Sequence, residues 1–173
     1  MNLKKYTAVV PCALISALTV TASIASAQDT QNQPSSAMSA AHERTIQGVW
    51  RTAVTPRNCQ TGDAILTLSG LFTFNQGGTM SEYGIGPGSS PALRSPGHGV
   101  WQREQGWQDY SFAFTFYRYD ASGVFIGSQK VRATLELDAG GDAFASRSAI
   151  EILDVNGGVI GSGCATAVGT RFE

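Results

Sequence analysis

YSFAFTFYRYDASGVFIGSQKVRATLELD, residues 110–138, is the stretch that decides the fold of this chain. Phenylalanine occupies every second position at Phe112, Phe114 and Phe116, and apolar residues again recur at every second position from 131 to 137. Side chains of a β-strand alternate between its two faces, so each half of the stretch reads as a half-buried strand. Residues 120–123 (DASG) are turn formers. The stretch therefore predicts a β-hairpin with one apolar face.

The same pattern extends in both directions from this hairpin. Eight strand-like runs, separated by Gly, Asp, Asn or Pro turns, cover residues 48–55, 64–75, 79–85, 99–104, 110–120, 124–138, 143–154 and 159–172. Eight antiparallel strands in simple succession are enough to close a small barrel, which removes exposed sheet edges. The sequence thus predicts an all-β, eight-stranded antiparallel up-and-down barrel, with no C-terminal helix.

Local signals refine this prediction at three places. Gly70, inside the second run, indicates a bulge or a sharp bend. Residues 86–97 are too rich in Gly, Pro and Ser for regular structure. Asn156-Gly157 predicts a hairpin with a type I′ turn. Residues 154–158 have a superficial likeness to a calcium loop, but they lack the later bidentate Glu, and a hairpin explains them.

The first 27 residues have the pattern of a secretory signal peptide. Lys4 and Lys5 precede an uncharged apolar stretch, residues 6–24, and Ala25-Ser26-Ala27 is an A-x-A cleavage site. Lipidation at Cys12 is a weaker alternative, because Pro11 stands where a small residue is needed. We therefore predict a signal peptide at 1–27, a flexible leader at 28–46 and a barrel domain at 47–173.

Composition limits the partners of the exported chain. Without Lys4 and Lys5, ten basic residues stand against thirteen acidic ones, a formal charge of −3 with no basic stripe, which disfavours nucleic-acid binding. No later run reaches the roughly 18 apolar residues of a membrane helix. An outer-membrane barrel remains open as an alternative, disfavoured by a last strand poor in bulky residues. The expected location is the periplasm or the extracellular medium.

Two cysteines, Cys59 and Cys164, remain after cleavage. An even pair in an exported chain predicts a disulfide, here joining the loop after the first strand to the last strand. Two free thiols or a metal site is the competing interpretation, and no nearby histidine pair supports it. We predict no metal and no cofactor.

The barrel interior is the candidate ligand site. An eight-stranded barrel is either filled by side chains or just wide enough for one small ligand. His98 is a candidate ligand contact, a candidate haem ligand, or an acid–base partner of Glu82 or Glu104, although a solvated loop histidine is the simpler interpretation. Arg118 either neutralises a ligand carboxylate or lies at the rim, which we favour. The predicted lumen residues are Phe72, Phe74, Phe112, Phe114, Phe116, Phe125, Leu135, Ile150, Ile152 and His98.

Gly48-Val49-Trp50 at the start of the first strand resembles the G-x-W signature of the lipocalin-like (calycin) superfamily, and Arg171 resembles its late arginine. In that family the indole and the guanidinium close one end of the barrel through a cation–π contact. The resemblance implies such a plug by Trp50 and Arg171. The sequence match is confined to Gly48, Trp50 and Arg171, and the helix-free form is closer to avidin-like or allene-oxide-cyclase-like barrels.

Family members usually bind small hydrophobic ligands, so the resemblance implies an exported barrel that binds one. The alternatives are a filled structural or oligomeric barrel, with Tyr117 and Tyr119 on its contact face, and an allene-oxide-cyclase-like isomerase acting on a lipid. No catalytic residue is assigned, and binding is favoured over catalysis.

Overall fold

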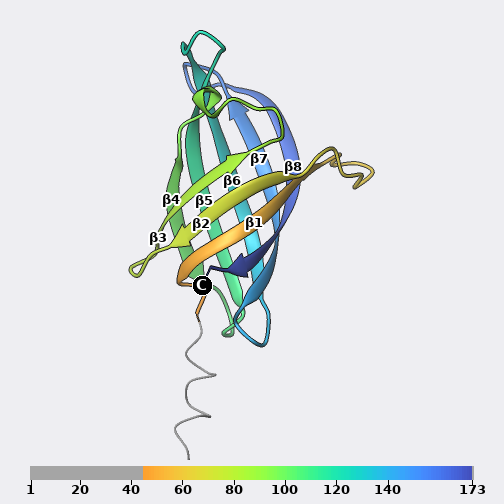
Figure 1. The fold of residues 1–173 in the computed structure, drawn as a ribbon, viewed down its shortest axis with the longest axis vertical. Helices are drawn as coiled ribbons and strands as arrows, with labels where there is room; N and C mark the ends of the chain where they lie inside the picture. The colour runs from red at the N-terminus through yellow and green to blue at the C-terminus, as the bar shows by residue number, and fades with distance from the viewer. Residues whose placement is uncertain (1–44, 173) are drawn as a thin grey trace, which may run out of the picture. The chain divides into compact units, whose positions relative to one another are not determined.

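The computed structural model describes residues 45–172, which form a closed eight-stranded antiparallel barrel in the order β1-β2-β3-β4-β5-β6-β7-β8 (Figure 1). The predicted fold class is confirmed. The predicted signal peptide and most of the leader lie outside the described residues. The strands are β1 (Gly48–Arg57), β2 (Leu68–Phe74), β3 (Thr79–Ile85), β4 (Gly97–Arg103), β5 (Asp109–Tyr119), β6 (Phe125–Leu137), β7 (Ala143–Leu153) and β8 (Val159–Arg171).

The connection between β3 and β4 was predicted to lack regular structure, and the structure differs from that prediction in one short segment. It contains one 3₁₀ turn, η1 (Pro91–Leu93), whose N-terminus is capped by Ser90. The Ser90 side chain accepts a hydrogen bond from the Ala92 amide at 3.3 Å, and proline is favoured at the start of such a turn because its missing N–H costs nothing there. Within residues 45–172, no helix is long and apolar enough to cross a membrane.

Aspartates organise the tight turns of the barrel. In the β5–β6 turn the Asp120 carboxylate accepts the amides of Ser122 and Val124, and in the β7–β8 turn Asp154 accepts those of Asn156 and Gly158. The hairpin predicted at residues 156–157 is present, but the type I′ turn is wrong. Asp154 pairs with Gly158, which leaves a three-residue loop in which Gly157 adopts a φ of 84°.

Gly70 does not mark a bulge. The β1–β2 register runs without interruption from Gly48↔Phe74 to Val54↔Leu68, and Gly70 pairs with Thr52. A Cβ atom at Gly70 would lie 2.5 Å from the Thr52 hydroxyl oxygen, so glycine makes room for that side chain. The Thr52 hydroxyl is buried and has no hydrogen-bond partner among the described residues.

This orphaned hydroxyl leads to a stability prediction. Thr52→Val replaces the hydroxyl with a methyl group of similar size, and a buried polar group without a partner costs about 1–3 kcal/mol. We expect the variant to raise the free energy of unfolding by about 1 kcal/mol, measured by urea denaturation. Thr55→Val, at a position whose hydroxyl contacts Thr67, is the matched control and should bring no gain. Equal gains in both variants would refute the explanation.

The half of the barrel near residues 45 and 172, the ends of the described segment, is filled with side chains. Four large side chains in this half are at most 2 % exposed: Trp50, Phe74, Met80 and Leu137. The Phe144 ring packs edge-on against the Trp50 ring, with the ring centroids 5.0 Å apart. Ile46 belongs to this core with no exposed surface. The packed domain therefore begins before residue 47, and the leader predicted to run to residue 46 is wrong at its last residues, because burial of the Ile46 side chain holds them against the barrel.

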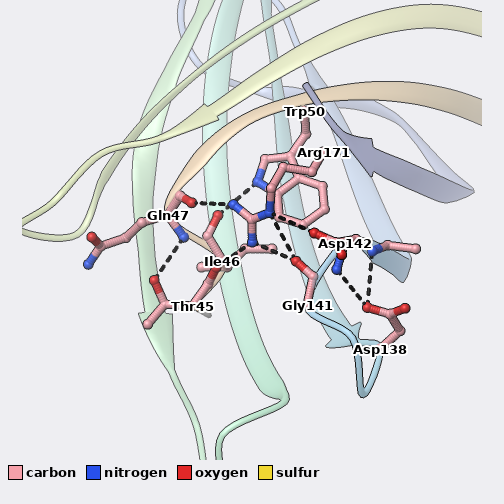
Figure 2. Close-up of polar contacts among 9 residues, drawn as sticks. Thr45, Ile46, Gln47, Trp50, Asp138, Gly141, Asp142 and Arg171 are labelled. Carbon is pink, nitrogen blue, oxygen red and sulfur yellow. Dashed lines mark hydrogen bonds and ion pairs between the residues drawn. The ribbon is translucent and has the colours of Figure 1, made fainter. Parts of the chain in front are cut away.

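Trp50 and Arg171 meet at this closed end (Figure 2). The Trp50 indole N–H donates to the Ile46 carbonyl at 2.8 Å, and the Arg171 guanidinium carbon lies 4.3 Å from the indole centroid. The same guanidinium donates to the carbonyls of Thr45, Gln47 and Gly141 at 2.6–3.0 Å. One planar cation thus joins the first residues of the domain to the β6–β7 turn, covering the end of the barrel.

The predicted disulfide is present. Cys59, in the connection after β1, is bonded to Cys164 of β8, with their Cα atoms 5.4 Å apart and 105 residues apart in sequence. The bond lies at the seam where β1 and β8 pair, from Trp50↔Arg171 to Arg57↔Cys164. Figure 1 shows these two strands. It therefore reinforces the contact that closes the barrel.

Candidate functional site

The other half of the barrel is hollow. A cavity of about 340 Å³ lies inside the strands, near the end formed by the β1–β2, β3–β4, β5–β6 and β7–β8 connections. This volume is near the lower end of the range of ligand pockets, about 300–1,000 Å³. Residues 86, 89–91 and 93 of the β3–β4 connection also line it, so this loop, which carries η1 in Figure 1, forms part of the cavity wall.

The phenylalanine ladder of the sequence forms the main apolar wall. Phe112, Phe114 and Phe116 of β5 face the cavity together with Phe72 of β2 and Ile150 of β7. The Phe72 ring contacts those of Phe112 and Phe114 edge-on, with centroids 5.9 and 6.0 Å apart. Small side chains on the β8 side leave the space open, since Ala165 and Ala167 line the opposite wall.

Two predicted lumen residues are buried but do not reach the cavity. Phe74 and Leu135 belong to the filled half, where Phe74 contacts Phe112, Phe144 and Trp101. Ile152, one inward position beyond Ile150, is half-buried and lies against Gly161 rather than the cavity.

Phe125 and His98 were placed in the lumen, and this placement is wrong. Phe125 is 42 % exposed, and its ring contacts those of Tyr117 and Tyr119 on the outside of the barrel. His98 is exposed on β4, where it pairs with Ser81 and Thr115. Neighbouring positions of a strand face opposite sides, so the inward-facing Gly97 puts His98 on the outer surface.

The acid–base pairing considered for His98 is not formed with either glutamate. Glu104 accepts hydrogen bonds from Ser111 and Gln102, which hold the pKa of its carboxyl below its usual value. Glu82 faces the interior and pairs instead with Arg94, Nη2 to Oε2 at 2.5 Å. The Glu82 side chain is only 5 % exposed, so its carboxyl has lost most of its water. This burial raises the pKa of Glu82, and the nearby Arg94 charge acts in the opposite direction.

Arg94 is held inside the barrel mouth by several elements. Its guanidinium lies 3.6 Å from the Phe116 centroid and donates to the carbonyls of Gly84 and Ser95 at 3.2 Å. The chain around it pairs with the end of β5, through an Arg94↔Arg118 bridge and a bond from the Ser95 amide to the Tyr117 carbonyl. The loop that carries Arg94 is therefore fixed both to β3 and to the end of β5.

Sequence reasoning missed this ion pair. The alternation of β3 carried a usable signal for Glu82, because Met80 and Gly84 share its face and a carboxyl between them needs a partner. Arg94 had no comparable signal, since the loop sequence does not say where its side chain folds. Gly97 completes the arrangement: a Cβ atom there would lie 2.5 Å from the Glu82 carboxylate.

The raised pKa of Glu82 predicts a pH dependence of stability. The folded state holds the Glu82 proton more tightly than the unfolded state, whose pKa is near 4.5, so this group stabilises the fold most below pH 4.5. Its contribution is lost as the pH rises through the folded-state value. We expect the free energy of unfolding of wild type, minus that of Glu82→Gln, to fall as the pH increases from 4.5.

Urea titrations of both proteins across this pH range measure that difference. Groups with lowered pKa values, such as Asp138, which accepts the amide of Ala143 and its neighbours, are common to both proteins and cancel. A difference that rises with pH would show that attraction to Arg94 outweighs burial and would contradict the prediction.

Arg118 also lines the cavity, toward its open end. It stands two residues after Phe116 on the inward face of β5, opposite Gly127 of β6. Gln129, Ser146 and Ser148 add uncharged polar groups to a wall that is mostly apolar. In the described part of the chain, no group of three or more His, Cys, Asp or Glu side chains is placed to hold a metal ion.

No protein-family model matches the sequence, and no curated protein matches it. Among solved structures, the chain is similar to an S-type phycobiliprotein lyase from Guillardia theta, with 11% sequence identity and a TM-score of 0.40. The similarity covers 79% of this chain and 93% of the lyase chain. At these values it carries no information about function.

Proposed function

We propose that this protein is an exported, lipocalin-like barrel that binds a small hydrophobic ligand in its lumen. The observation that carries the proposal is the cavity of about 340 Å³ walled by Phe72, Phe112, Phe114 and Phe116. Burial of apolar ligand surface against such a wall is favourable by roughly 25 cal/mol per Å². The pocket is mostly apolar with a few polar groups, which is the usual composition of small-molecule sites.

Three further features support the proposal. The Trp50–Arg171 contact is the one that the lipocalin-like resemblance implies. The Cys59–Cys164 disulfide is suited to an oxidising compartment outside the cytoplasm. The cavity also weakens the alternative of a filled barrel, because side chains fill only one half of the lumen. The isomerase alternative has no observation of its own in its favour.

Binding of a neutral fluorescent dye tests the proposal. We expect 1-N-phenylnaphthylamine, an uncharged aromatic probe, to increase its fluorescence on binding the purified protein at a single site. Ala165→Phe fills the cavity from β8 and should weaken this binding at least about tenfold, or 1.4 kcal/mol. Ala145→Phe makes the same change at an exposed position of β7 and should leave binding unchanged.

Thermal unfolding of each variant shows whether it is folded, and Ala167→Leu offers a smaller filling substitution should Ala165→Phe not fold. Wild-type protein that does not bind the dye would refute the proposed function. Equal binding by the cavity and surface variants would place the dye on the outer surface and would also refute it.

A further inference from the structure

We propose that the ligand of this cavity is an amphiphile with an anionic head group, which Arg118 binds at the mouth while the apolar body lies against the phenylalanine rings. This inference rests on the proposed function and adds the chemical class of the ligand.

Arg118 is an unpaired cation in the cavity wall. Among residues 45–172, no hydrogen bond, ion pair or ring contact occupies its side chain, although arginine presents five N–H donors and keeps its charge at any ordinary pH. Most other arginines of the barrel are engaged: Arg171 with three carbonyls, Arg132 with Glu151, Arg57 with Thr166. Arg118 is half-buried beside apolar side chains, so burial of its side chain removes water without a protein partner in return, which favours an incoming acceptor.

The charges of the cavity leave this cation uncompensated. Among residues 45–172, three ionisable side chains line it: Glu82, Arg94 and Arg118. Glu82 is already bonded to Arg94, so the two charges offset each other. The nearest turn carboxylate in sequence, Asp120, accepts the amides of Ser122 and Val124 instead. The cavity thus carries one net positive charge, and a carboxylate or similar anion would complement it.

The position of Arg118 also gives the ligand an orientation. Along β5 the inward residues run Phe112, Phe114, Phe116 and then Arg118, from the middle of the barrel toward the β5–β6 turn. The cation is therefore one step nearer the open end than the aromatic wall. Gln129 of β6, paired with Phe116, also lines the cavity, and its side chain makes no hydrogen bond within residues 45–172, so its side-chain amide is available as a second donor. An amphiphile would enter with its apolar end first and leave its anion beside these two groups.

Two ligands with chains of the same length separate the contribution of head-group charge to binding from that of apolar contact. Decanoate and decanol are compared by displacement of the neutral dye from wild type, Arg118→Gln, Arg118→Lys and Arg132→Gln. We expect Arg118→Gln to weaken decanoate at least about tenfold, the effect of losing hydrogen bonds to a charged group, while decanol changes by less than about twofold. Arg118→Lys should restore part of the decanoate affinity. Arg132→Gln removes the same charge on the outer face and should change neither ligand.

The outcomes distinguish this inference from the proposed function. A selective loss of decanoate in Arg118→Gln supports the anionic head group. Equal losses of both ligands, or no loss of either, would overturn it while dye and decanol binding by wild type leave the proposed function intact. Absence of dye and decanol binding in wild type would instead defeat the proposed function. If Arg118→Gln does not fold, the Arg118→Lys variant and wild type decide, and a wild type that binds decanoate no more tightly than decanol overturns the inference.

Discussion

Trp50→Ala is expected to lower the free energy of unfolding by about 3–5 kcal/mol, the usual cost of removing a fully buried aromatic side chain. Trp50 has no exposed surface, contacts Phe144, and stacks against Arg171 (Figure 2). Its loss leaves a void at the closed end and removes the indole N–H that donates a hydrogen bond to the Ile46 carbonyl. Urea denaturation followed by circular dichroism measures the change.

Trp101→Ala is the matched control for this prediction. The Trp101 indole also donates to a backbone carbonyl, that of Asn75 at 2.9 Å, but the residue is only half-buried. We expect its replacement to cost about 1–2 kcal/mol. Equal losses for the two tryptophans would contradict a special role for Trp50. Dye binding should survive in any Trp50→Ala protein that remains folded, because Trp50 does not line the cavity.

Removing the disulfide is the second large effect. Cys59→Ser combined with Cys164→Ser frees a loop of 105 residues in the unfolded chain. On the chain-entropy account, a closed loop of about 100 residues is worth about 4.7 kcal/mol, and native disulfides of small exported domains typically contribute about 2–5 kcal/mol. We therefore expect a loss of about 4–5 kcal/mol in urea denaturation.

Two further measurements test whether the lost stability comes from the freed loop of the unfolded chain. The denaturant dependence should steepen in the double variant, because an unfolded chain without the cross-link exposes more surface. Chemically reduced wild type should match the double variant in both stability and steepness. If the double variant loses less than about 1 kcal/mol of unfolding free energy, the prediction is contradicted. The hydrogen bonds between β1 and β8 would then hold the two strands together without the disulfide, and the unfolded chain would gain little conformational freedom from its removal. Neither cysteine lines the cavity, so dye affinity of the folded variant should be preserved.

The alternation of apolar and polar residues along the sequence predicted most of the barrel, because one face of each strand is buried. Phe112, Phe114 and Phe116 had to share a face, and once that face is inside, the register of the neighbouring strands is constrained by the same requirement. The disulfide could also be predicted, since Cys59 and Cys164 are the two cysteines that lie outside the predicted signal peptide.

Phe125 shows where such reasoning fails. It stands an even number of residues before Val131, which places it inside if the alternation is unbroken. In the barrel, Arg118 pairs with Gly127 but Tyr119 pairs with Phe125, so one extra residue, Ile126, is inserted in β6. One inserted residue reverses the faces of everything beyond it. Phe125 therefore joins Tyr117 on the outer surface.

The sequence by itself determined that the chain forms eight alternating strands with one apolar face, because hydrophobic periodicity and turn residues are local properties. Only the tertiary structure decided that one half of the lumen is filled and the other hollow, since this depends on which side chains meet across the barrel. Alanines of β8 face phenylalanines of β5 and leave a space, whereas Trp50 meets Phe144 and leaves none. The Glu82–Arg94 pair and the Arg118 cation, which has no side-chain partner in the described part of the chain, arise in the same way, from a loop and strands that are distant along the chain.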